Sequence, residues 1–175
     1  MLTIERVYGE VKRIGEGEFI LAAPRDAPDG IGCALGIMPW DGRYTVIETE
    51  RIESWGAESW RDYWAMFPLE AGKLYPFAYF RCTATVAEWG EVRGGKPEDQ
   101  IILGSMRRPG AAGRQHRLCL SATEGTVHIG WGADTLSLRI RNSGHLAGRP
   151  GHYGRLGHYC EASIVKVKVT QGGRS

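Results

Sequence analysis

One glycine-rich segment, Gly144 to Cys160, gathers more chemically versatile side chains than any other stretch of similar length. Its sequence, GHLAGRPGHYGRLGHYC, holds three of the five histidines together with two arginines and two tyrosines. Connections between secondary-structure elements usually span about 4–6 residues, and longer irregular ones are commonly functional or disordered. The aromatic and charged content indicates a loop that binds a partner.

The side chains of this segment suit two kinds of partner. Sugars are held by aromatic faces and by planar groups that form paired hydrogen bonds, and the arginine forks also match the carboxylate of an acidic sugar. Protein subunit contacts are enriched in the same residue types, so an assembly contact is the alternative. The candidate ligand-binding residues of the segment are His145, Arg149, His152, Tyr153, Arg155, His158 and Tyr159.

We expect neither a metal nor a cofactor here. The three histidines are seven and six residues apart across glycines, a spacing that imposes no ligand geometry, unlike the i, i+4 pair of a zinc-protease helix. Cysteines occur without a C-x-x-C pair, which argues against a zinc knuckle or a redox site and favours buried free thiols. The four are Cys33, Cys82, Cys119 and Cys160.

Two tryptophans elsewhere are further candidates for stacking on a sugar. Trp40 lies in the predicted turn Pro39 to Gly42, whose Asp-Gly pair suits positive backbone dihedrals, and we expect its ring to be exposed. Trp89 follows a predicted strand and is expected on the rim beside other loops. Trp55, Trp60 and Trp64 are better explained as a cover over one end of the core.

Catalysis has little support in the motifs. Ser143 does not stand in a Gly-x-Ser-x-Gly elbow, and no glycine-rich phosphate loop is present. An enzyme whose site is assembled from distant strands remains an alternative, because glycosidases need two carboxylates that sequence spacing does not reveal. The carboxylates considered for that role are Glu88, Glu91 and Asp134.

Short alternating runs of apolar and polar residues predict an all-β fold, an antiparallel β-sandwich of the jelly-roll type. One short helix is expected within Ser54 to Pro68, because Trp60 and Trp64 are spaced i, i+4. The predicted strands lie within Thr3 to Lys12, Phe19 to Ala23, Arg43 to Glu50, Leu74 to Ala87, Ile101 to Met106, Arg117 to Ala122, Thr126 to Trp131, Thr135 to Arg141 and Ala162 to Thr170.

Length and charge narrow the classes of protein. The 175 residues fit a single domain, 1–175, and 22 basic against 20 acidic residues give a net charge of +2. With no basic block, nucleic acid is not an expected partner.

The N-terminus has no apolar signal core and no window reaches the ~20 apolar residues of a membrane span. We therefore expect synthesis in the cytoplasm without a signal peptide and no membrane insertion.

The order of elements resembles a jelly-roll carbohydrate-binding module from Leu69 to Thr170. The run LEAGKLY at Leu69 to Tyr75 leads into a long apolar strand, Trp131 precedes TLSLRIR, and a Lys/Val strand closes the region. Similar β-sandwich domains occur in phage fibres and spikes. The closing strand, SIVKVKV, lacks the acidic pair that many such modules carry before it, which puts their structural calcium site in doubt.

These observations together predict a non-catalytic domain that recognises a cell-surface glycan or polysaccharide. Because a binding fold of this kind occurs without a signal peptide, we expect a component of a phage or phage-like particle, with homo-oligomers or other particle subunits as further partners. The alternatives are a purely structural sandwich of such a particle, in which Gly144 to Cys160 contacts a neighbouring subunit, and a carbohydrate-active enzyme.

Overall fold

The computed structural model describes residues 2–28, 32–55, 64–68, 75–82, 86–94, 99–107, 115–123, 126–132, 134–139 and 155–172. The chain forms fourteen strands there, and no α-helix occurs within those ranges. The strands make two sheets of seven, and all neighbouring strands run antiparallel. This arrangement confirms the predicted all-β sandwich.

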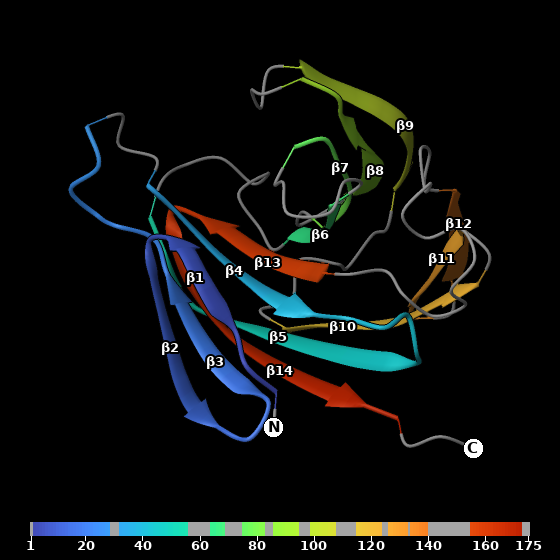
Figure 1. The fold of residues 1–175 in the computed structure, drawn as a ribbon. Coiled ribbons are helices and arrows are strands. Elements are labelled where there is room, and N and C mark those ends of the chain that lie inside the picture. Colours follow the sequence, from blue (N-terminus) through green and yellow to red (C-terminus); the bar gives the residue numbers. More distant parts are fainter. Residues whose placement is uncertain are drawn as a thin grey trace.

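The two sheets are named sheet A and sheet B. The order in sheet A is β1 (Glu5–Tyr8), β4 (Cys33–Pro39), β13 (Arg155–Glu161), β6 (Trp64–Pro68), β7 (Phe77–Cys82), β8 (Val86–Val92) and β9 (Gln100–Arg107). The order in sheet B is β12 (Asp134–Arg139), β11 (Thr126–Trp131), β10 (Gln115–Thr123), β5 (Thr45–Ser54), β14 (Ser163–Gln171), β3 (Glu18–Ala22) and β2 (Glu10–Gly15). In Figure 1, β4 and β13 of sheet A lie above β5 and β14 of sheet B.

Residue alternation decides which face of each strand is buried. In β14, Val165, Val167 and Val169 are at most 4% exposed, and the intervening lysines lie on the other face. Side chains of a strand point alternately to its two faces, so a regular polar and apolar alternation places one set in the core. The valines join a large apolar cluster between the sheets, to which both sheets contribute.

Sheet A is buried on its second face as well. Ala78 and Phe80 of β7 point into the core between the sheets, as predicted, while Phe77 and Tyr79 belong to a separate apolar cluster. That cluster consists of Leu35, Ile37, Met66, Phe77, Tyr79 and Val92, with Tyr8, Tyr75 and Tyr159 packed against it. The alternation within Phe77–Cys82 therefore separates two apolar environments rather than core from solvent.

Two sequence predictions need correction. The helix within Ser54 to Pro68 is wrong at both described ends, because β5 runs to Ser54 and β6 covers Trp64–Pro68; residues 56–63 lie outside the described residues. Phe67 packs in the core between the sheets and Met66 in the second cluster, a period of two that only a strand provides. The single long strand predicted over Leu74 to Ala87 is instead the pair β7 and β8.

Candidate functional site

A cavity of about 780 Å³ opens where the N-terminal residues, the β2–β3 turn and the ends of β4 and β14 meet. We call it the rim cavity. Its size is that of ordinary small-ligand sites, which span about 300–1,000 Å³. Its wall is formed by Leu2, Thr3, Glu16, Gly17, Pro39, Trp40, Asp41, Val169, Thr170 and Gln171.

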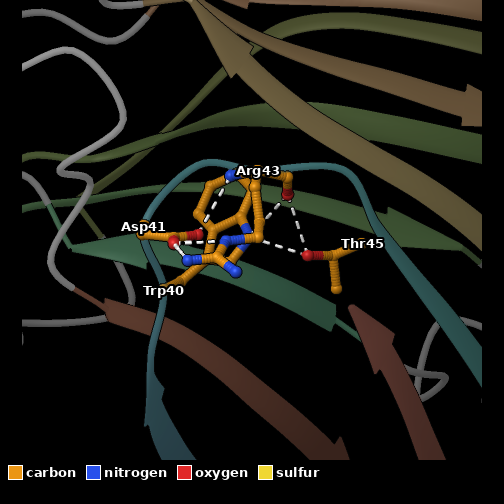
Figure 2. A network of polar contacts seen from close by, with 4 residues as sticks. All are labelled: Trp40, Asp41, Arg43 and Thr45. Atoms are coloured by element: carbon orange, nitrogen blue, oxygen red, sulfur yellow. Dashed lines mark hydrogen bonds and ion pairs between the residues drawn. The ribbon is translucent and has the colours of Figure 1, made fainter. Parts of the chain in front are cut away.

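Trp40 anchors one wall of the rim cavity from within the core. Its indole is 3% exposed and packs against Phe67 with ring centroids 5.8 Å apart. The Trp40 Nε1–H donates to the Thr45 hydroxyl at 3.0 Å and to the Arg43 carbonyl at 3.3 Å (Figure 2). The expectation of an exposed Trp40 ring is therefore wrong, because a partner five residues later satisfies its polar atom inside the sandwich.

Asp41 is held in place by Arg43 in the same turn. The Arg43 backbone N–H donates to Asp41 Oδ1 at 3.1 Å, and the Arg43 guanidinium pairs with the carboxylate (Figure 2). Partial burial alone would raise the pKa of the Asp41 carboxyl, but these hydrogen bonds prevail and hold the pKa below its ordinary value. Gly42 adopts a φ of 80° between them, as the Asp-Gly pair predicts. The cavity wall thus carries an ionised, fixed hydrogen-bond acceptor.

The opposite wall depends on a close approach between the β2–β3 turn and β14. Gly17 has a φ of 67°, and a Cβ built on it would lie 2.4 Å from the Val169 carbonyl oxygen. The Val169 N–H donates to the Gly17 carbonyl at 2.8 Å. Glycine is therefore required at this position, and the contact sets exposed Glu16 beside Thr170 and Gln171 on the cavity wall.

A smaller hollow of about 190 Å³ adjoins the rim cavity. The two share Thr3 and Pro39, and the smaller one is also lined by Arg155 and Glu5. Arg155 is exposed at the start of β13, opposite Pro39 of β4. Of the predicted ligand-binding residues, the structure thus brings Trp40 and Arg155 to neighbouring parts of the same rim.

The other predicted ligand-binding residues lie elsewhere. His158 is fully buried, with its Nε2 3.1 Å from the Met38 sulfur. Tyr159 is half-buried on the second face of sheet A, where its hydroxyl donates to Glu161 at 2.6 Å and its ring meets Tyr8 edge-on. His145, Arg149, His152 and Tyr153 lie outside the described residues.

Trp89 lies in β8 rather than beyond a strand end, which corrects its predicted position on the loop-bearing rim. Its ring packs against the core between the sheets and lies over Gly104 of β9, where an added Cβ would come within 2.4 Å of the ring. The side chain is only partly exposed. Because Leu74 to Ala87 was predicted as one strand, the hairpin that places Trp89 within β8 was missed.

A polar cluster on the second face of sheet A was also missed. The Arg81 guanidinium donates to Glu88 Oε1 at 2.6 Å, and the Gln100 amide donates to the same oxygen at 3.1 Å. Tyr79 contributes its hydroxyl at 3.3 Å from Glu88, and partial burial, the largest cause, raises the pKa of Tyr79 to about 12. Arg81 and Glu88 are only 13% and 12% exposed, so the ion pair is well shielded from water.

The two carboxylates of β8 do not face each other. Glu88 lies opposite Arg81 and Glu91 opposite Ala78, and the regular β7–β8 register puts these two positions on opposite faces of sheet A. Glu91 is 2% exposed and pairs with Arg93 at 3.1 Å. The Asp134 side chain lies outside the described residues. Glu88 and Glu91 therefore do not form the acid and base pair considered for an enzyme.

Within the described ranges, no group of three or more histidine, cysteine, aspartate or glutamate side chains is placed to hold a metal ion. Nor does the described part of the chain contain a helix long and apolar enough to cross a membrane. Cys119 and Cys160 are free thiols. The Cys160 thiol is buried, and burial is the largest cause that raises its pKa to about 12.

No protein-family model matches the chain. No curated protein matches it in sequence either.

Solved structures share the fold at very low sequence identity. The carbohydrate-binding module CBM66 from Bacillus subtilis superposes with a TM-score of 0.61 and 9% identity, covering 97% of this chain and 95% of the module. A Bacillus licheniformis β-glucanase gives a TM-score of 0.54 and 10% identity over 99% and 92% of the two chains. Sheep galectin-11, solved with glycerol, gives 0.51 and 9% identity over 78% and 96%. At such identities the likeness shows the jelly-roll sandwich fold.

Proposed function

We propose that this protein is a non-catalytic glycan-recognition domain that binds its ligand in the rim cavity. The observation that carries the proposal is an open, ligand-sized cavity whose wall combines a fixed carboxylate with hydroxyl, amide and apolar groups. The fold supports it, since a carbohydrate-binding module and a galectin are built on the same sandwich.

The chemistry of the wall suits a sugar. A saccharide presents several hydroxyl donors and acceptors around an apolar C–H surface. Asp41 offers a charged acceptor that Arg43 keeps in one orientation, and charge-assisted hydrogen bonds are the stronger ones. Thr3, Thr170 and Gln171 add neutral partners, and Leu2 and Pro39 add apolar surface. A fixed acceptor lowers the entropy that binding must overcome.

Recognition is favoured over hydrolysis at this site. A glycosidase needs a carboxylic acid that keeps its proton near neutral pH, which requires a raised pKa. The Asp41 pKa is instead held below its ordinary value by Arg43. Glucanases nevertheless share the fold, so an enzyme is the alternative against which the binding experiment must discriminate.

The first test is a glycan array probed with the purified chain, followed by calorimetry on the saccharide class that binds. Asp41→Asn and Gln171→Ala should each weaken binding by about tenfold, the loss expected for one or two hydrogen bonds to a bound ligand. Glu48→Gln is the matched control, because Glu48 is exposed in β5 and does not line the rim cavity.

Three outcomes would contradict the proposal. A blank array removes glycan recognition altogether. Binding that survives both rim variants places the ligand elsewhere. Release of reducing ends or unsaturated sugars from the bound class identifies an enzyme. Membership of a phage or phage-like particle, and synthesis without a signal peptide, remain predictions of the sequence that this experiment does not address.

A further inference from the structure

We propose that the smaller hollow is a second subsite beside the rim cavity and binds an acidic sugar, so that the ligand is an oligosaccharide containing a uronic acid. This inference rests on the proposed function and names its ligand class. The smaller hollow has a volume of about 190 Å³ and shares Thr3 and Pro39 with the rim cavity. A chain of two sugars can therefore cross these shared residues and place one ring on each side of them.

The floor of the smaller hollow is apolar and lies on the second face of sheet A. Ile37 belongs to the apolar cluster on that face, and Pro39 follows two residues later in β4. Side chains two residues apart in a strand point to the same face. Ile37 is 6% exposed and Pro39 is exposed. The floor, chiefly Pro39, therefore offers apolar surface to the C–H groups of a sugar ring.

Arg155 and Glu5 stand on opposite sides of this floor. Arg155 of β13 pairs with Pro39, and Glu5 of β1 pairs with Ile37, so β4 separates the two charged residues. Residues directly opposite in a ladder share a face, which places both side chains on the face of the floor. Both are exposed, and neither forms an ion pair with another described residue. The smaller hollow therefore has a cationic donor on one side and a carboxylate acceptor on the other.

A uronic acid matches this arrangement. Its carboxylate is planar and accepts two parallel hydrogen bonds, which the fork of the Arg155 guanidinium can donate. Its ring hydroxyls can donate to the Glu5 carboxylate, and its C–H face covers the apolar floor. A neutral sugar would use the floor and Glu5 but would give the guanidinium no charged acceptor. The donor on this wall therefore favours the acidic sugar.

The rim cavity favours a neutral sugar instead. Its wall carries the carboxylates of Glu16 and Asp41 and, among the described residues that line it, neither lysine nor arginine. A like charge placed against these acids is unfavourable. A uronate carboxylate would face them in the rim cavity, whereas it would face Arg155 in the smaller hollow. The chain therefore binds in one direction, with its acidic residue in the smaller hollow.

Calorimetry with matched pairs of ligands tests the second subsite. The probes are glucuronate-containing oligosaccharides from hyaluronan, heparosan and glucuronoxylan, in which the acidic residue has a neutral neighbour. Each is compared with the same oligosaccharide after its carboxylates are reduced to primary alcohols. At least one acid should bind about tenfold more tightly than its reduced form, the gain expected for hydrogen bonds between two charged groups.

Protein variants assign that preference to one side chain. Arg155→Gln should lower the affinity for the acid by about tenfold and leave the affinity for the reduced form unchanged. Arg155→Lys should keep only part of the preference, because an ammonium group keeps the charge but lacks the fork. Arg117→Gln is the matched control, since Arg117 is exposed in β10 of sheet B and lines neither cavity. Thermal unfolding midpoints check that each variant is folded.

The outcomes separate this inference from the proposed function. Equal binding of the acid and its reduced form, weakened by Asp41→Asn, keeps glycan recognition in the rim cavity and overturns the acidic subsite. A preference for the acid that survives Arg155→Gln overturns it as well. Oligosaccharides of dextran sulfate that bind more tightly than every uronate, and depend on Arg155, replace the carboxylate with a sulfate. Absence of binding to every saccharide overturns the proposed function and, with it, this inference.

Discussion

His158 places an imidazole where water does not reach it. The side chain is fully buried between the sheets with its Nε2 3.1 Å from the Met38 sulfur. Burial disfavours the charged form and lowers the pKa of His158 from 6.5 to about 3. The folded protein therefore holds this histidine neutral under conditions in which the unfolded chain protonates it.

This difference makes His158 a source of acid sensitivity. As pH falls, the unfolded chain binds a proton at His158 before the folded protein does. The contribution of the neutral imidazole to the free energy of unfolding is therefore complete above pH 6.5. It is lost as pH falls from about 6.5 toward 3, by roughly 1.4 kcal/mol per pH unit. Urea unfolding of the parent between pH 7 and pH 4 should show this slope, and His158→Leu should reduce it.

His128→Gln is the matched control, since His128 lies on the outer face of sheet B and contacts Ser137 at 2.9 Å. It should retain the acid sensitivity of the parent. An equal slope in the parent and in His158→Leu would show that other groups cause the acid response.

Exposure of single residues was the hardest property to predict. Trp40 stands beside Asp41-Gly42, a strong turn signal, and the turn is present, yet its indole is buried against Phe67, which is distant in sequence. His158 falls in the glycine-rich segment predicted to bind a partner, but it belongs to β13 and faces the core. Sequence spacing reports local conformation, whereas these burials depend on which distant strands become neighbours.

At the scale of elements, the β2–β3 turn is the feature most sensitive to one added methyl group. Gly17→Ala places a Cβ at positive φ and 2.4 Å from the Val169 carbonyl oxygen. The turn must then separate from β14, and we expect a loss of about 1–3 kcal/mol in the free energy of unfolding. Because the turn also forms part of the rim cavity, the same change should weaken glycan binding. Urea unfolding and calorimetry measure the two effects.

Gly15→Ala gives the comparison within the same hairpin. The three heavy atoms nearest its added Cβ all belong to the flexible Glu18 side chain, at 3.3 Å or more, and Gly15 is not among the glycines with positive φ. This variant should stay within about 1 kcal/mol of the parent. Equal losses at the two positions would show that the close approach to β14 is not what the turn depends on.

Strand prediction succeeded where one face of a strand meets solvent. The alternation of valine with lysine in Ser163–Gln171 predicts β14 and its buried face correctly. Strand prediction failed where apolar residues occupy both faces, as in Phe77–Cys82. No alternation of polar and apolar residues then marks where the strand ends. The spacing of Trp60 and Trp64 within Ser54 to Pro68 suggested a helix. The described part of that segment, Trp64–Pro68, is a strand in which Phe67 and Met66 pack in two different apolar clusters.

At the scale of the whole molecule, β14 is the strand on which sheet B depends. It lies between β5 and β3, pairing with β5 along its whole length and with β3 from Ile164 to Lys168. A chain ending at Ala162 lacks this strand and the three valines it adds to the core. We expect such a chain to lose cooperative thermal unfolding, since a gap in the centre of a sheet leaves the backbone of both neighbours unpaired.

Circular dichroism and calorimetry of the truncated chain check this expectation, with a chain that ends after Gly172 as the control. A synthetic peptide of residues 163–171 should restore the cooperative transition if the gap is the cause. A truncated chain that unfolds cooperatively on its own would show that the rest of the sandwich is sufficient.

The same pairing has a consequence for biosynthesis. Ser54 of β5 pairs with Ser163 of β14, and Cys33 of β4 pairs with Glu161 of β13, so interior strands of both sheets receive partners that are translated much later. The backbone groups along one edge of β4 and of β5 therefore stay unpaired while the ribosome makes the rest of the chain. The sandwich therefore closes only after translation of β14, and the nascent chain is a natural client for chaperones that shield apolar strands.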